Sequence, residues 1–313
     1  MGHCGRRRFP PSSFVRRKFI LQLAVVIAIA AIVFGGWCAR FISDLATPPH
    51  RPVGAVPANL TFAVESVRFK ADDGVSLSGW FLPCPGATRA VVLLHGGRRN
   101  RLAMVPHAQL LRKQGYAVLL YDARGHGESD DAPSARAWRV DDDLVGALDY
   151  LRGRGFREFG LLGLSQGGIN IALAAGRLRD LCWVVLECTP ADVRDIIRHD
   201  IANAVPVPEW LAGAVAVPML QWKMGMSAGD FVLRDQVGKF RCPVFVIAGG
   251  GDVRVLPAEA RDLFDNVTAP KTFWLIPGAP HTNFYLYLPA IKDDYEKRVL
   301  SFIDAAVKKK RAE

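Results

Sequence analysis

Ser165 stands in the sequence Gly163-Leu164-Ser165-Gln166-Gly167, which follows an apolar run and precedes a helix-forming stretch. A serine on a sharp turn from strand to helix presents its hydroxyl above the edge of a sheet, and the turn needs small neighbours because strand and helix come close together. The free N–H groups of the following helix favour negative charge that develops beside them. This pattern predicts a nucleophilic serine for acyl transfer.

Such a serine needs a base, because its hydroxyl is a weak nucleophile until its proton is removed. His281 follows the last predicted strand and comes after Ser165, as the chain order serine, acid, histidine of this kind of site requires. Asp252 lies between them, directly after another predicted strand, and is the predicted acid that orients the imidazole. Glu187, which ends the preceding strand, is the alternative acid.

An acyl-transfer site also needs two N–H donors for the oxyanion. The backbone N–H of Gln166, directly after the serine, is the first candidate. The second is Gly97 in the glycine-rich loop His95-Gly96-Gly97-Arg98, where His95 is expected to hold the loop through its ring. The cysteines and histidines show no metal-ligand spacing, so neither a metal nor another cofactor is expected.

The elements that must position these residues are short apolar strands separated by helix-length segments. Uniformly apolar strands that alternate with helices predict an α/β fold, with a mainly parallel central sheet and helices on both faces. An alternating hairpin over residues 61–81 precedes them. The strands are expected at 90–94, 117–121, 159–163, 182–186, 244–248 and 272–276, and the helices near 102–114, 138–153, 166–179, 257–266 and 289–308.

Residues 190–240 interrupt this alternation. The segment is rich in Met and Trp and contains several prolines, with no confident strand. A 50-residue insertion of this kind between two core strands favours a helical lid over an apolar pocket. A helical layer that covers the edge of the sheet is the alternative.

Residues 19–39 form an uncharged apolar run that is long enough to cross a bilayer as a helix. We expect a signal anchor that is not cleaved, because the run exceeds the usual apolar region of a signal peptide and bulky Trp37 stands where cleavage would occur. A secreted protein after signal cleavage is the alternative. Six basic residues precede the run, which predicts a single-pass protein with a cytoplasmic N-terminus and an extracytoplasmic catalytic domain.

The formal net charge of +10 lies mostly at the two ends of the chain. The basic cytoplasmic tail 1–18, which we expect to lack regular structure, carries +6, and the basic tail 308–313 carries +3, so the rest of the chain is close to neutral. Nucleic-acid binding needs a charged face on the fold and is not expected. Residues 40–60 are predicted to form a Pro-rich linker, and residues 61–307 are predicted to form the catalytic domain.

From about residue 62 to 307 the chain resembles the α/β-hydrolase superfamily, and in particular the serine hydrolases that include monoacylglycerol lipases and serine aminopeptidase-like esterases. Besides the turn at Ser165, the run Asp122-Ala123-Arg124-Gly125-His126-Gly127-Glu128-Ser129 is similar to the D-x-R-G-x-G-x-S loop of that branch. The resemblance implies that Asp122 and Arg124 brace the active-site edge of the sheet.

The sequence thus predicts a membrane-tethered serine hydrolase that cleaves a carboxylic ester through an acyl-enzyme. The apolar insertion and the membrane run favour a lipophilic acyl substrate, either a small molecule or a lipid ester. A thioesterase, or a peptidase or amidase, with the same three residues is the alternative, because one scaffold supports many reactions. A catalytically silent binding protein is the competing class.

Overall fold

The computed structural model describes residues 13–48, 50–132, 139–282, 284 and 289–312. Its centre is an eight-stranded sheet with the strand order β1-β2-β4-β3-β5-β6-β7-β8. Six of these strands were expected at almost the same positions. The strands are β1 (Glu65–Lys70), β2 (Ser76–Leu82), β3 (Arg89–Leu94), β4 (Ala117–Tyr121), β5 (Glu158–Leu164), β6 (Leu181–Glu187), β7 (Val244–Gly249) and β8 (Lys271–Ile276).

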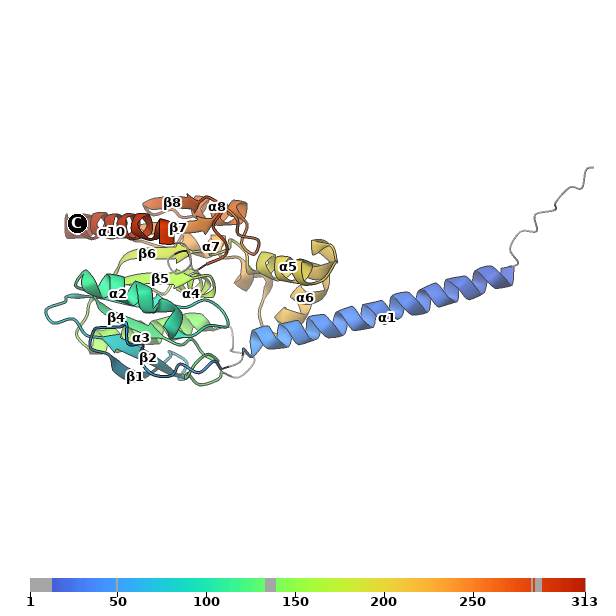
Figure 1. Ribbon diagram of the computed structural model, residues 1–313, viewed down its shortest axis with the longest axis horizontal. Coiled ribbons are helices and arrows are strands. Elements are labelled where there is room, and N and C mark those ends of the chain that lie inside the picture. Colours follow the sequence, from blue (N-terminus) through green and yellow to red (C-terminus); the bar gives the residue numbers. More distant parts are fainter. Residues whose placement is uncertain (1–12, 49, 133–138, 283, 285–288, 313) are drawn as a thin grey trace, which may run out of the picture.

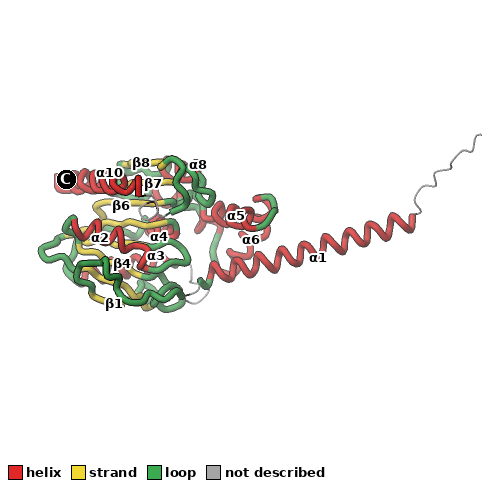
Figure 2. The backbone as a smooth tube through the Cα atoms, in the orientation of Figure 1, coloured by secondary structure: helices red, strands yellow, loops and turns green. Residues whose placement is uncertain are grey.

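The sheet is mixed in direction. β1 and β2 form the antiparallel hairpin, and β2 also pairs antiparallel with β4. The pairs from β4 through β3, β5, β6 and β7 to β8 are all parallel. The carboxyl ends of these parallel strands therefore meet at one edge, where ligand sites of open α/β sheets form. Figure 2 shows loops gathered at the edge that faces α5 and α6.

Two apolar cores lie on opposite faces of the sheet because alternate strand residues point to opposite sides. Within β3, Val92 belongs to one core and Val91 and Leu93 to the other. Helices α3 (Val140–Gly153), α4 (Gln166–Ala174), α7 (Arg234–Val237) and α8 (Pro257–Asp265) cover the first core, and α2 (Val105–Lys113) with α10 (Pro289–Ala312) cover the second. A short 3₁₀ turn, η1 (Arg101–Met104), precedes α2.

The insertion between β6 and β7 is helical. It contains α5 (Val193–Ala204), α6 (Glu209–Met224), the 3₁₀ turn η3 (Ala228–Phe231) and α7. In Figure 1, α5 and α6 stand off the main body, beyond the carboxyl ends of the parallel strands. They are the elements that lie over the edge where the predicted site residues meet.

The N-terminal apolar run belongs to α1 (Ser13–Ala46), a helix long enough to cross a membrane. Figure 1 shows it projecting from the body beside α6. Its outer part is exposed, but Cys38 and Ile42 are buried against α5 and α6. The last three turns of α1 therefore pack on the insertion rather than hanging free.

The ends of this helix differ from the sequence prediction. Residues 13–18 of the predicted irregular tail are helical, and residues 1–12 lie outside the described part of the chain. Residues 40–46 of the predicted linker are also helical, because Phe41, Ile42 and Leu45 continue the apolar pattern and pack on the insertion. The helix ends just before Pro48, whose ring disfavours helical geometry in the preceding residue. At the other terminus, α10 extends through the predicted basic tail to Ala312.

Candidate active site

Ser165 occupies a strained turn between β5 and α4. Its φ of 50° and ψ of −109° are unusual for a residue with a side chain, and such strain is characteristic of functional turns. A Cβ on Gly163 would approach the backbone of Gly167 to 2.5 Å, and one on Gly167 would collide with the carbonyl of Leu94. The two flanking glycines are therefore required by the close approach of β5, α4 and β3, as the sequence pattern implied.

The structure brings Ser165, His281 and Asp252 together. Nε2 of His281 lies 2.9 Å from Oγ of Ser165, and Nδ1 of His281 lies 2.7 Å from Oδ2 of Asp252. An ionised carboxylate only accepts hydrogen bonds, so Nδ1 carries the proton and donates it to Asp252. Nε2 is then free to accept from the serine hydroxyl. This is the chain of hydrogen bonds that a serine nucleophile requires.

The surroundings of Asp252 keep it ionised. Burial of the carboxyl favours its neutral form, but the hydrogen bond from His281 and the backbone N–H groups of Val255 and Arg254 outweigh it and lower the pKa of Asp252. Both N–H groups lie 2.9 Å from Oδ1. One oxygen is thus held by the loop after β7, and the other remains for the imidazole.

Glu187, the alternative acid, is buried but faces a different group of side chains. The hydroxyl of Tyr295 donates to Oε1 of Glu187, and Nε2 of His107 lies 3.6 Å from the same oxygen. Among the described residues no hydrogen bond joins Glu187 to His281. Its contribution to the site is its backbone carbonyl, which accepts the N–H of Ser165 at 2.7 Å.

The two predicted oxyanion residues are neighbours. Gly97 and Gln166 both line the cavity beside Ser165, and a Cβ on Gly97 would lie 2.6 Å from Oε1 of Gln166. A side chain at position 97 would therefore displace the end of the Gln166 side chain. This places a backbone segment from the loop after β3 next to the first residue of α4, beside the serine.

His95 and His126 tie that loop to the one after β4. Nε2 of His95 accepts the N–H of Ala123 at 3.1 Å, so its Nδ1 carries the proton and donates to the carbonyl of Gly96 at 2.8 Å. His126 accepts the N–H of Arg98 through Nε2 at 3.3 Å in the same manner. Burial, followed by the nearby His126, lowers the pKa of His95 to about 3, so it stays neutral. The glycine-rich loop sequence predicts the hydrogen bonds of His95, but not those of His126.

Asp122 and Arg124 brace this edge of the sheet, as the family resemblance implied. Oδ1 of Asp122 accepts the N–H of Arg101 at 2.7 Å, and Oδ2 lies 3.0 Å from the Arg101 guanidinium. The Arg124 guanidinium donates to Asp143 at 2.7 Å and to both oxygens of Asp73 at 2.9 Å. These buried ion pairs fix the loop to α3 and to the β1–β2 turn.

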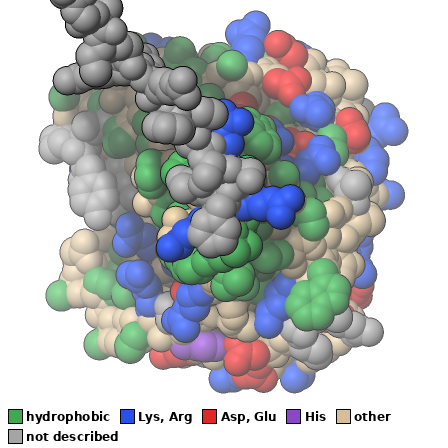
Figure 3. All heavy atoms as spheres, turned by 90° about the vertical axis from the view of Figure 1, so that its right-hand side faces the viewer, with side chains coloured by type: hydrophobic (Ala, Val, Ile, Leu, Met, Phe, Trp, Pro, Cys, Tyr) green, Lys and Arg blue, Asp and Glu red, His purple; other side chains and the backbone are tan. Residues whose placement is uncertain are grey.

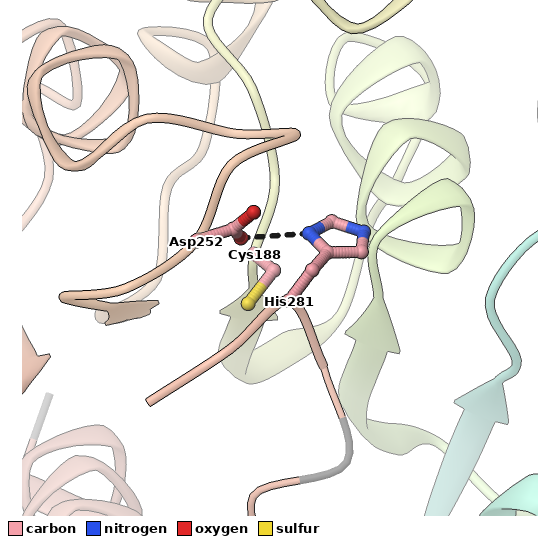
Figure 4. A group of neighbouring side chains, drawn as sticks. All are labelled: Cys188, Asp252 and His281. Carbon is pink, nitrogen blue, oxygen red and sulfur yellow. Dashed lines mark hydrogen bonds and ion pairs between the residues drawn. The ribbon is translucent and has the colours of Figure 1, made fainter. Parts of the chain in front are cut away.

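Cys188 lies beside the imidazole and the carboxylate, as Figure 4 shows. Cysteine, aspartate and histidine can together bind a metal ion, and their ligand atoms lie within 4.8 Å of one another. However, His281 and Asp252 are hydrogen-bonded to each other, and burial raises the pKa of the Cys188 thiol well above its usual value. The donor set is therefore better suited to proton transfer than to metal binding.

A cavity of about 610 Å³ opens above Ser165, a size typical of small-molecule sites. Its walls come from the insertion and, unexpectedly, from α1. Ile197, Leu220 and Met224 line it from α5 and α6, while Phe41 and Leu45 line it from the end of α1. The wall from α1 was not predicted from the sequence. The apolar spacing of Phe41 and Leu45 beyond Arg40 was the available signal.

Comparison with known proteins assigns the chain to a family. The pattern of the alpha/beta hydrolase family matches residues 91–301, two thirds of the chain. The chain belongs to the α/β-hydrolase family. An uncharacterized protein of Salmonella typhimurium, YfhR, is 34% identical over 278 residues, which cover 84% of this chain and 88% of that protein. An uncharacterized membrane protein of Saccharomyces cerevisiae is 27% identical over 173 residues, covering 54% of this chain and 57% of that protein.

Solved structures agree with this α/β-hydrolase fold. The Pyrococcus furiosus esterase Pf2001 is similar with a TM-score of 0.70 and 24% identity, covering 83% of this chain and 97% of that one. A membrane phospholipase A described as a bacterial virulence factor is similar with a TM-score of 0.56 and 15% identity, covering 93% of this chain and 99% of that one. Together the comparisons support a hydrolase.

Proposed function

We propose that this α/β-hydrolase is a membrane-tethered serine hydrolase that cleaves the carboxylic ester of a lipophilic acyl compound. The observation that carries the proposal is the line of hydrogen bonds from Ser165 through His281 to Asp252, at the floor of a largely apolar cavity. The resemblance to esterase structures supports the fold on which such a site is built.

The proposed reaction proceeds through an acyl-enzyme. Oγ of Ser165 attacks the ester carbonyl while Nε2 of His281 takes its proton, and the charge of Asp252 stabilises the imidazolium. The N–H groups of Gly97 and Gln166 hold the oxyanion of the tetrahedral intermediate. The imidazolium then protonates the departing alcohol. Water, activated by the same imidazole, releases the acid and restores Ser165.

The cavity walls support a lipophilic acyl group. Leucine, isoleucine, methionine and phenylalanine side chains line the part formed by α1, α5 and α6. Burying each methylene of an acyl chain there contributes about 0.8 kcal/mol. Arg98, Asp200 and Arg254 also line the cavity. Arg254 and Asp200 are paired with each other through two hydrogen bonds of 2.6 Å, and Arg98 offers hydrogen bonds to an ester head group.

The packing of α1 supports an anchor that is retained in the mature protein. Cleavage near Ala39 would remove Cys38, Trp37 and Phe34 from their cluster with the insertion, where Cys38 is fully buried. Such a cut would leave Ile197 and Leu220 partly uncovered. The excess of basic residues before the span supports a cytoplasmic N-terminus and an extracytoplasmic catalytic domain.

A fluorophosphonate probe and p-nitrophenyl esters test the nucleophile in the full-length protein. We expect Ser165→Ala to abolish labelling and to lower kcat by about 10⁴-fold or more, since the covalent step is lost. Ser301→Ala, at an exposed position on α10, is the matched control and should label normally. Labelling that survives in Ser165→Ala would refute the assignment.

A further inference from the structure

The exposed face of α6 carries large apolar side chains in a single row. Trp210, Ala214, Pro218 and Trp222 are exposed at intervals of four residues, a spacing that places them on one side of a helix. The two tryptophans at the ends of the row are 72% and 85% exposed. The row is about 18 Å long at 1.5 Å per residue. The remaining exposed residue of α6 is Glu209, in its first turn.

The position of α6 relative to α1 indicates which environment surrounds this row. α6 packs against α1, and Phe34 and Trp37 join the cluster that α1 forms with α5 and α6. Both residues belong to the uncharged run 19–39. Phe34 lies five residues before the end of that run, which is about 8 Å along the helix axis. A helix that packs on this stretch must lie at the level of the bilayer surface if α1 spans the bilayer.

Figure 3 views the side of the molecule from which α1 projects, so that this helix points toward the viewer and stands in front of the body. Tryptophan is enriched at the membrane–water interface because its ring is apolar while its N–H bonds to water or head groups. An apolar row with a tryptophan at each end suits this environment.

We propose that the row Trp210, Ala214, Pro218 and Trp222 lies in the interface of the bilayer that α1 spans, and that it holds the mouth of the cavity against the lipid. This inference rests on the membrane-spanning role of α1 in the proposed function. Phe41 and Leu45 of α1 and Leu220 of α6 line the same cavity. An acyl chain therefore passes from the bilayer to Ser165 along surfaces that are already apolar.

Tryptophan quenching in nanodiscs tests the docking directly. Full-length protein is placed in phosphatidylcholine discs with or without bromine at positions 6 and 7 of one acyl chain. Subtracting the emission of Trp210→Phe/Trp222→Phe isolates the two tryptophans from Trp37 and the others. We expect brominated lipid to reduce this difference at least twofold. An unchanged difference would overturn the proposal.

Activity gives the second measurement. Trp210→Ser/Trp222→Ser should hydrolyse a long-chain ester held in the bilayer at least fivefold more slowly, while p-nitrophenyl acetate turnover stays within twofold. Leu275→Ser, at an exposed apolar position on β8, is the matched control and should change neither rate. Equal loss on both substrates would mean that the row supports the fold rather than docking.

Two further outcomes separate the alternatives. If native mass spectrometry finds two chains per disc, and one chain after the double serine substitution, the row is an interface between copies and the docking proposal is wrong. Ser165→Ala keeps both tryptophans and should show the same quenching as the wild type. If the wild type shows quenching but no esterase activity, the proposed function is wrong and the docking proposal stands.

Discussion

At the scale of single residues, two buried carboxylates lie near the carboxyl ends of the neighbouring strands β6 and β7 but have different partners. Asp252 accepts two backbone N–H groups and the imidazole of His281, whereas Glu187 accepts the hydroxyl of Tyr295. Only the first arrangement can fix the tautomer of a catalytic histidine. The difference arises from the loop after β7, which turns Asp252 toward the serine.

Substitution of these two acids should therefore have separate effects. We expect Asp252→Asn to lower kcat for p-nitrophenyl acetate by about 10³–10⁴-fold with little change in folding, because the amide would stabilise the wrong tautomer. Glu187→Gln is the control and should lower the melting temperature while retaining most of kcat. A larger loss of kcat in Glu187→Gln would reverse the assignment of the acid.

The neutral state of His95 makes stability depend on pH. Its folded pKa of about 3, lowered chiefly by burial, lies below the unfolded value of about 6.5. As the pH falls from 7 to 5, His95 therefore binds a proton in the unfolded chain but not in the folded one. This lowers the free energy of unfolding by about 2 kcal/mol. Denaturant unfolding of the wild type and of His95→Asn at both pH values measures this contribution as the difference between the two proteins, and the substitution should make the loss on acidification smaller.

His50 should affect the pH dependence of stability in the opposite direction from His95. A hydrogen bond to Asp131, assisted by the carbonyl of Gly127, raises the pKa of His50. A raised pKa contributes stability that is present at low pH and is lost as the pH rises. His50→Gln should therefore make the loss of stability on acidification steeper. A shallower loss would contradict the predicted sign.

The sequence was sufficient to bring the proposed catalytic residues together because each one lies in the turn or loop that follows a parallel strand. Carboxyl ends of parallel strands meet at one edge, so Ser165, Asp252 and His281 converge once the strand order is right. The same rule could not separate Asp252 from Glu187, since both lie near the carboxyl end of a parallel strand. It also missed the tie through His126, because a hydrogen bond from a ring to the N–H of Arg98 leaves no periodic pattern in the sequence.

At the scale of the elements, α1 differs most from the expected arrangement. The apolar run predicted where a helix would lie, but not that its last turns would form a wall of the cavity. Contacts between Ile42 and residues of α5 and α6 join segments about 150 residues apart. Sequence periodicity describes only which face of α1 is apolar, not which element that face contacts.

The wall from α1 should set the length of the acyl chain. Leu45→Trp would fill part of the cavity, and loss of room for two methylenes costs about 1.6 kcal/mol, or roughly tenfold in kcat/KM. We expect this loss for decanoyl esters and little change for acetyl esters. Arg40→Trp, on an exposed position of the same helix, is the control. Equal losses for both chain lengths would show that Leu45 does not contact the acyl group.

At the scale of the whole molecule, the proposed topology places the catalytic domain outside the cytoplasm. Alkaline phosphatase fused after Glu313 should be active in bacterial cells, because that enzyme folds only in an oxidising compartment. A green fluorescent protein fused at the same point reports the opposite orientation through cytoplasmic fluorescence. We expect the phosphatase fusion to be active. If the fluorescent protein fusion is fluorescent and the phosphatase fusion is inactive, the catalytic domain lies in the cytoplasm and the proposed orientation is wrong.

The buried end of α1 also affects how the reaction should be measured. Because Cys38 and Ile42 pack on α5 and α6, the proposed membrane-anchored enzyme would have no flexible tether with which to search the solution. Its substrate would then reach it by lateral diffusion within the bilayer. The quantity that saturates the enzyme would be the mole fraction of ester in the surrounding lipid, so diluting the bilayer with inert lipid should slow turnover even when the bulk ester concentration is unchanged.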